Sequence, residues 1–207
     1  MNPADYPADM QKLKEICHLF GDRGWCRATS GNFSSRIDDS HCLITRSGRD
    51  KSRLKDEDLM VCTLDGRAVD PTQHPSAETP VHTSLYRLDD SIGAVLHTHS
   101  VNATLLSLQN DGALTIRGYE MQKALAGVTS HEQASVVPIF ANDQDMVALG
   151  GRIVAAWSAG QIAVPGFLIA GHGLYAWGRD LAEAQRHTEG FEFLFECLLL
   201  QGLAIRS

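Results

Sequence analysis

His97 and His99 lie one residue apart at the end of the apolar run AVLHTHS, residues 94–100. In a β-strand, residues two apart point to the same side, so both imidazoles would project together while Thr98 faces away. Neutral imidazoles bind Zn²⁺ at about 2.0–2.1 Å. The pattern predicts two ligands of a metal site, although a pair of polar residues that simply ends a strand fits it as well.

A catalytic zinc site commonly has three protein ligands and leaves one position open for water or substrate. Among the seven other histidines, His172 stands out because it lies between glycines in AGHGLYAWG, where the backbone can bend sharply. We therefore take His172 as the candidate third ligand. Spacing alone leaves the metal site and a structural role equally open. Tyr175 and Trp177 alternate behind this turn, and we expect them to pack in the core.

The elements that would position these histidines alternate between helices and strands. Helical spacing of apolar residues predicts helices over 8–20, 79–88, 101–109, 144–158 and 180–201. Asp180 is expected to cap the last of these helices, and Gly150-Gly151 to interrupt the fourth. Short apolar runs predict strands at 43–45, 91–98 and 134–140, and two more around His172. A hairpin is expected at 58–69 and a polar turn at 27–36. This mixture predicts an α/β protein with a mixed, partly antiparallel sheet.

The composition limits the classes of partner. The 207 residues suit one domain over 1–207, and the formal charge of −7 disfavours nucleic acid or an anionic membrane as a general partner. No stretch approaches the roughly 20 apolar residues of a membrane span. The five cysteines are scattered without CxxC spacing, which is typical of free thiols in a reducing compartment. We expect a cytoplasmic protein, and a small phosphorylated substrate remains compatible with its charge.

Four motifs in this order, TSGNFSSR, PSAETPVHTSLYR, AVLHTHS and GHGLYAWG, resemble the class II aldolase/epimerase family. The resemblance implies a three-layer α/β/α fold with a mixed, largely antiparallel central sheet. It also implies a homotetramer with sites near the subunit interfaces and one Zn²⁺ per subunit. By this resemblance His97, His99 and His172 correspond to the metal-binding histidines. Glu78 corresponds to the carboxylate that serves the aldolases as catalytic acid/base.

The stretch IRGYEMQKALAG, residues 116–127, is similar to one branch of that family. This branch dehydrates 5-methylthioribulose 1-phosphate to 2,3-diketo-5-methylthiopentyl 1-phosphate in methionine salvage. The resemblance implies a zinc-dependent hydro-lyase in which Glu120 is the catalytic acid/base. The position of Glu120 after apolar Ile116 and Tyr119 does not by itself distinguish this role from that of a solvated helix residue, and the family resemblance favours the catalytic role. Two alternatives remain: a class II sugar-phosphate aldolase or pentose-phosphate 4-epimerase that uses Glu78, and a non-catalytic interaction domain like the adducin head.

A phosphorylated ketose needs hydrogen-bond donors around its phosphate. Two glycine-containing turns supply hydroxyls and backbone N–H groups that can line an anion site, and a lysine and a further serine lie nearby in the motifs. The candidate phosphate-binding residues are Ser30, Gly31, Asn32, Ser47, Gly48, Lys51 and Ser76. Ala77 stands where the family has a second serine, which removes one hydroxyl. No residue is assigned to a pocket for the methylthio group.

Overall fold

The computed structural model describes residues 1–204 and is built on an eight-stranded sheet with the order β3-β2-β1-β4-β8-β7-β6-β5. Neighbouring strands are antiparallel except β6 and β7, which are parallel. The strands are β1 (Asn32–Arg36), β2 (His41–Thr45), β3 (Leu59–Thr63), β4 (Ala94–Thr98), β5 (Ala113–Ile116), β6 (Ser135–Phe140), β7 (Gly166–Ile169) and β8 (Gly173–Gly178). The expected mixed, largely antiparallel sheet is confirmed.

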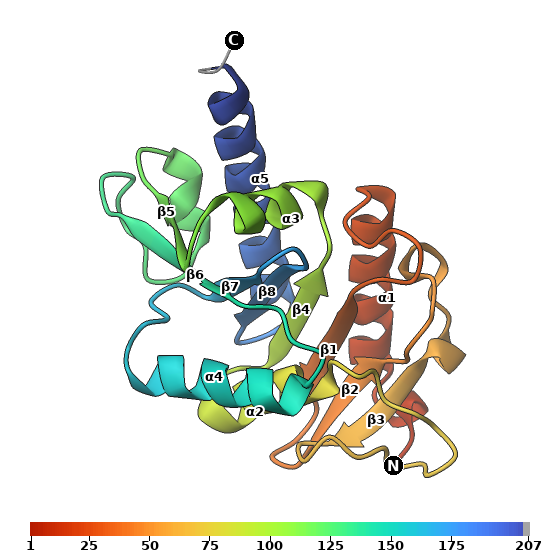
Figure 1. Ribbon diagram of the computed structural model, residues 1–207. Coiled ribbons are helices and arrows are strands. Elements are labelled where there is room, and N and C mark those ends of the chain that lie inside the picture. Colours follow the sequence, from red (N-terminus) through yellow and green to blue (C-terminus); the bar gives the residue numbers. More distant parts are fainter. Residues whose placement is uncertain (205–207) are drawn as a thin grey trace.

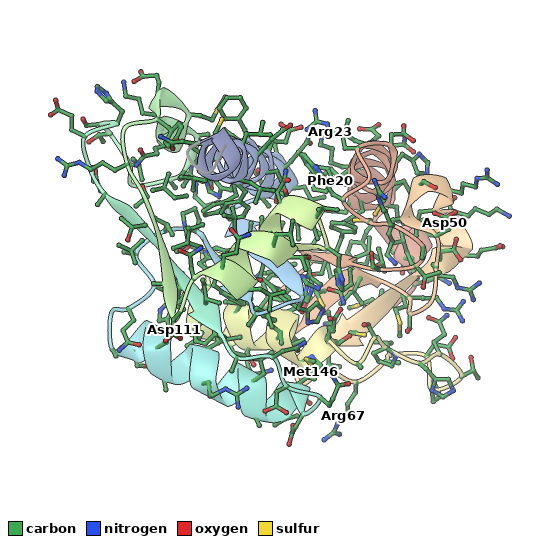
Figure 2. The ribbon with its side chains drawn as sticks, turned by 45° about the horizontal axis from the view of Figure 1, so that its top comes forward. Phe20, Arg23, Asp50, Arg67, Asp111 and Met146 are labelled. Atoms are coloured by element: carbon green, nitrogen blue, oxygen red, sulfur yellow. The ribbon has the colours of Figure 1, made fainter. Side chains whose placement is uncertain are left out.

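Helices cover both faces of this sheet (Figure 1). The five α-helices are α1 (Pro7–Asp22), α2 (Thr79–Leu88), α3 (Val101–Gln109), α4 (Met146–Ser158) and α5 (Leu181–Ala204). One core cluster lies between the sheet and α2 and α4, and two further clusters lie under α1 and under α3 and α5. Phe20 of α1 and Met146 of α4 belong to opposite cores (Figure 2). The expected three-layer α/β/α fold is confirmed.

The central strand β4 is buried on both faces, which explains its continuous apolar sequence. Val95 packs into the core under α2 and α4, whereas Leu96 packs into the core under α1. Because side chains alternate along a strand, His97 follows Val95 to the first face and Thr98 follows Leu96 to the second. This alternation directs the two histidines away from α5 and directs Thr98 toward it.

The predicted break at Gly150-Gly151 is wrong, because α4 continues through both residues. A Cβ added to Gly150 would lie 2.9 Å from Oγ of Ser84 on α2, whereas one added to Gly151 would meet nothing within 4 Å. Gly150 therefore permits close packing of two helices and does not end one of them.

The polar turn expected at 27–36 is wrong for its second half, since residues 32–36 form β1 between β2 and β4. Its serines are buried, yet their hydroxyls are paired: Ser34 Oγ lies 2.7 Å from the Tyr86 hydroxyl, and Ser35 donates to Asp9. The return strand of the hairpin at 58–69 is only a bridge between Cys62 and Ala68, and β5 was not expected at all. The other predicted elements are confirmed, including the Asp180 cap.

None of the helices in residues 1–204 combines the length and apolar character needed to cross a membrane.

Candidate metal centre

Four side chains from three separate segments converge at the end of β4. Glu78 directly precedes α2, His97 and His99 lie at the end of β4, and His172 lies in the turn between β7 and β8. One potential ligand atom from each of the four lies within 4.8 Å of the others. The structure thus brings together the three predicted histidines and adds the predicted Glu78.

The spacing of the imidazole nitrogens fits a metal ion. Nε2 of His97 lies 3.3 Å from Nε2 of His172, and two nitrogens on a tetrahedral zinc at about 2.05 Å are about 3.4 Å apart. Nε2 of His99 is buried and has no hydrogen-bond partner among the described residues. A buried nitrogen without a partner beside two facing nitrogens is the arrangement that a bound cation would satisfy. Imidazole ligands accept several divalent metals, so the donor set leaves the identity of the metal open.

Backbone and side-chain acceptors orient the histidines. Nδ1 of His97 lies 2.8 Å from the carbonyl oxygen of Leu174, which assigns the proton to Nδ1 and leaves Nε2 free for a metal. Nδ1 of His172 lies 3.4 Å from Oδ1 of Asn142, a residue that the sequence had not singled out. The His97 ring also stacks on Tyr175 at 4.0 Å between centroids. Tyr175 and Trp177 are buried in the core, as expected.

One carboxylate oxygen of Glu78 faces the histidines, and the other accepts a hydrogen bond from Asn32 on β1. Its Oε1 lies 2.8 Å from Nε2 of His172 and 3.4 Å from Nε2 of His97, while Oε2 accepts from Asn32 Nδ2 at 2.6 Å. Burial favours the neutral acid, but in the metal-free protein the charge that His97 and His172 carry when protonated, with their hydrogen bonds to Glu78, outweighs burial and lowers the pKa of Glu78. The ionised carboxylate is suited to bind a metal or to accept a proton.

A chain of buried hydrogen bonds between β1 and α2 holds Asn32, and through it Glu78, in place. His82 contacts Oδ1 of Asn32 through Nε2, and its Nδ1 lies 2.8 Å from Oγ of Ser34. Burial lowers the pKa of His82 to about 3, so the ring is neutral. The Tyr86 hydroxyl closes the chain at Ser34. The sequence alone does not single out His82, Ser34 and Tyr86 as functional residues, although they lie within the motifs quoted above.

A pocket of about 220 Å³ lies directly beside the four-residue cluster. All seven candidate phosphate-binding residues line it, together with Thr29, Arg46, Glu78 and His99. Oγ of Ser30 is buried without a partner among the described residues and is therefore available to a ligand. Gly31 is required here, because its φ of +75° is left-handed and an added Cβ would lie 2.7 Å from the carbonyl oxygen of His97.

Two basic residues border this pocket in different ways. Lys51 is buried and its Nζ donates to the carbonyl oxygens of Thr29 and Arg49, so it ties the two turns together, and burial lowers its pKa. Arg46, which the sequence had not singled out, donates to the carbonyl oxygen of Glu57 from the pocket rim. Both bring positive charge to a pocket rich in hydroxyl groups.

Glu120 lies apart from this site within its own chain. It begins the short 3₁₀ helix η4 (Glu120–Ala124), and its side chain is 71% exposed. Its carboxylate pairs with Lys123 and lies 3.4 Å from Nδ1 of His131. The hydrogen bond from Lys123 lowers the pKa of Glu120. Glu120 neither joins the four-residue cluster nor lines the neighbouring pocket.

Comparison with known proteins agrees with the fold and the cluster. Residues 11–199 match the class II aldolase and adducin N-terminal domain family. The L-fuculose-1-phosphate aldolase of Thermus thermophilus is a similar solved structure, with a TM-score of 0.76, 26% identity and 95% of each chain covered. The chain belongs to the class II aldolase and adducin N-terminal domain family.

Curated relatives define the branch. The methylthioribulose-1-phosphate dehydratase of Serratia proteamaculans (strain 568) is 51% identical over 94% of this chain and 95% of its own length. That of Pectobacterium atrosepticum is 53% identical over 92% of this chain and 93% of its own. Within the family, the chain groups with the methylthioribulose-1-phosphate dehydratases, which are lyases.

Proposed function

We propose that the protein is a zinc-dependent lyase that removes water from 5-methylthioribulose 1-phosphate and forms 2,3-diketo-5-methylthiopentyl 1-phosphate. The observation that carries this proposal is the set of three histidine nitrogens and one ionised carboxylate beside a pocket rich in hydroxyl groups. More than 50% identity to relatives named for this reaction supports the same substrate.

The reaction needs one proton removed and one hydroxide released as water. A carboxylate takes the proton from C3, and the C4 hydroxyl leaves with a proton that a carboxylic acid returns. The resulting enol tautomerises to the 2,3-diketone, so the carbon chain and the phosphate stay intact. His97, His99 and His172 would hold a divalent metal, which would polarise the substrate carbonyl and stabilise negative charge on its oxygen.

The pocket beside the metal centre is proposed to hold the substrate phosphate. The unpartnered hydroxyl of Ser30 and the backbone N–H groups of the two turns supply donors, while Lys51 and Arg46 supply positive charge. Asn32 has a different task, because its amide nitrogen is already engaged by Glu78 and Ser76. It orients the carboxylate, and its backbone pairs with His97 across β1 and β4, so neither its amide nitrogen nor its backbone is assigned to the phosphate.

We infer that Glu120 acts as acid/base in the site of a neighbouring subunit of a homotetramer. Exposed apolar side chains on α3 and next to Glu120 support contacts of both regions with other subunits. Val101, Leu105 and Leu108 are 54%, 39% and 65% exposed along one side of α3, and Leu108 packs beside the turn that carries His172. Met121, next to Glu120, is 41% exposed. A copy whose η4 covers the α3 side of its neighbour would bring Glu120 toward the metal centre.

The proposal further includes one zinc ion per subunit, a single catalytic domain over 1–207, a cytoplasmic location and a place in methionine salvage. Five free cysteines in the structure suit a reducing compartment.

Replacement of Glu120 by Gln tests the role of this side chain, because it keeps the shape and removes the acid/base. The variant should bind zinc as the wild type does while kcat falls about 10²–10⁴-fold. Turnover and metal content are measured on the same preparation, and Glu132→Gln, an exposed carboxylate in the neighbouring loop, is the matched control. Near-normal turnover of Glu120→Gln would remove Glu120 from the mechanism.

A class II aldolase is the second candidate, and the placement of Glu78 favours it. Glu78 is the carboxylate that faces the histidines within one chain, and it occupies the position of the aldolase acid/base by family resemblance. An aldolase would release a short aldehyde from a deoxyketose 1-phosphate, and Glu78→Gln would abolish that cleavage. The complete cluster of histidines weighs against a non-catalytic interaction domain.

A further inference from the structure

Thr98 lies between the two histidine ligands in the chain but points away from them, toward α5. Its Oγ1 donates to Oε1 of Glu192 at 3.0 Å. Thr98 is fully buried and Glu192 is 2% exposed. One hydrogen bond therefore connects the metal-bearing end of β4 to a helix that begins more than eighty residues later in the chain.

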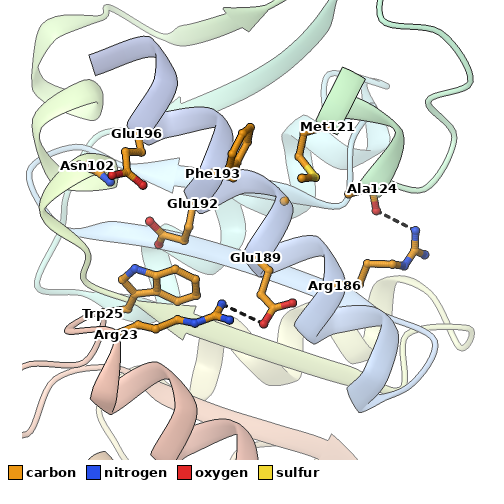
Figure 3. A pocket seen from close by; sticks show the side chains of 11 residues that line it. Arg23, Trp25, Asn102, Met121, Ala124, Arg186, Glu189, Glu192, Phe193 and Glu196 are labelled. Atoms are coloured by element: carbon orange, nitrogen blue, oxygen red, sulfur yellow. Dashed lines mark hydrogen bonds and ion pairs between the residues drawn. The ribbon is translucent and has the colours of Figure 1, made fainter. Parts of the chain in front are cut away.

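Glu192 is an unusual residue for this position. Its second oxygen, Oε2, is buried and has no hydrogen-bond partner among the described residues. The side chain borders a pocket of about 540 Å³ that lies between α5, η4 and the segment that follows α1 (Figure 3). Burial raises the pKa of Glu192 to about 7, the hydroxyls of Ser100 and Thr98 partly offset this, and the nearby Glu196 adds to it.

The cations around this pocket are engaged elsewhere. Arg23 pairs with Glu189 at 2.9 Å, and Arg186 donates to the carbonyl oxygen of Ala124 (Figure 3). Glu192 thus has no ion-pair partner among the described residues. A buried carboxyl group without a compensating charge destabilises the fold. A contribution to stability therefore does not explain why a glutamate occupies position 192. Its hydrogen bond to Thr98 points to a role at the end of β4.

The end of β4 is held on several sides. The backbone N–H of His99 donates to the carbonyl oxygen of Trp25 at 2.8 Å. A Cβ added to Gly173 would lie 1.9 Å from the carbonyl oxygen of Thr98, so the backbone of β8 packs directly against Thr98. These contacts hold the backbone of β4 through its N–H and carbonyl groups, whereas the hydrogen bond between Thr98 and Glu192 holds it from the face opposite the two imidazoles.

We infer that Glu192 is a positioning residue of the metal centre: through Thr98 it fixes the rotation of the β4 end, and so the direction in which His97 and His99 present Nε2. The inference rests on the proposed metal-dependent function. It concerns metal binding, which is measured separately from turnover.

Two substitutions break the contact from either side. Glu192→Leu removes the acceptor, and Thr98→Val removes the donor while keeping the shape of the side chain. Each should weaken Zn²⁺ affinity about 10–100-fold, the usual effect of losing a group that orients metal ligands. The dissociation constant is measured by competition with a chromogenic chelator. Glu192→Gln keeps a carbonyl acceptor for Thr98 and should restore the affinity to about that of the wild type.

Glu189→Gln is the matched control, since Glu189 lies one turn earlier on α5, borders the same pocket and pairs with Arg23. The Co²⁺-substituted proteins provide a second readout. The visible absorption bands should shift in Glu192→Leu and Thr98→Val, and should match the wild type in Glu192→Gln and Glu189→Gln. A merely structural role would lower the melting temperature without moving these bands.

Wild-type Zn²⁺ affinity and Co²⁺ spectra in folded Glu192→Leu and Thr98→Val would overturn the inference. If Glu192→Leu does not fold, the Zn²⁺ affinity and Co²⁺ spectrum of Thr98→Val alone test the inference. A protein that loses metal affinity in these variants but never dehydrates the ketose phosphate would contradict the proposed function and leave the positioning role of Glu192 standing.

Discussion

At the residue scale, the protonation states of the histidines and of Glu78 define the candidate metal centre. The Leu174 carbonyl assigns the proton of His97 to Nδ1, the buried Nε2 of His99 has no hydrogen-bond partner among the described residues, and the neighbours of Glu78 keep its carboxylate ionised. Glu192 is the opposite case, because burial holds its proton up to neutral pH. The pKa of the Glu78 carboxyl group is therefore lowered on one face of β4, and that of the Glu192 carboxyl group is raised on the opposite face.

The raised pKa of Glu192 predicts a specific pH dependence of stability. Its pKa rises from 4.5 in the unfolded chain to about 7 in the folded protein. The folded state therefore binds a proton that the unfolded state has released, so the stabilisation is complete below about pH 4.5 and is lost as the pH rises through about 7. The difference amounts to about 3 kcal/mol.

Urea unfolding of the metal-free wild type and of Glu192→Gln at several pH values measures this contribution. Relative to the wild type, the Gln variant should gain about 3 kcal/mol in free energy of unfolding between pH 4.5 and 8. Parallel stability curves for the two proteins would show that Glu192 does not titrate in this range.

At the element scale, close packing between α2 and α4 depends on one of two adjacent glycines. Gly150 faces Ser84, whereas Gly151 has open space around it. Gly150→Leu should destabilise the protein by about 1–3 kcal/mol through overpacking, while Gly151→Ala should stabilise it by up to about 1 kcal/mol through helix propensity. Chemical denaturation measures both. Equal effects of the two substitutions would contradict this packing.

The sequence predicts those elements whose apolar residues follow a helical or strand period, such as α1, α2, β4 and β8. It fails at β1, because hydrogen bonds to residues distant in sequence, such as Tyr86, make buried serines acceptable in a central strand. The histidine cluster follows from alternation in β4 together with the family motifs. The contacts of Asn142 and Glu192 could not be predicted, because they depend on tertiary pairing between residues far apart in the chain.

At the scale of the whole molecule, Glu120 and the metal centre occupy separate parts of one chain. The proposed tetramer unites them between subunits, which makes each site depend on two chains. Glu120→Gln and His97→Ala should each be inactive as pure proteins. Mixed oligomers of the two should regain activity, because some sites then combine an intact metal centre with an intact Glu120.

Random mixing in equal amounts around a cyclic interface would restore about a quarter of the sites. Coexpression of the two variants with different affinity tags allows the mixed oligomers to be isolated and assayed. Activity no higher than that of either variant alone would show that Glu120 does not act across a subunit boundary.

The most direct test of the central claim is the mass of the product formed from 5-methylthioribulose 1-phosphate by the zinc-loaded protein. We predict the loss of one water with the carbon chain and phosphate intact, and no such product after the metal is removed by a chelator. An unchanged substrate, or two shorter fragments from cleavage of a carbon–carbon bond, would contradict the assignment as a dehydratase.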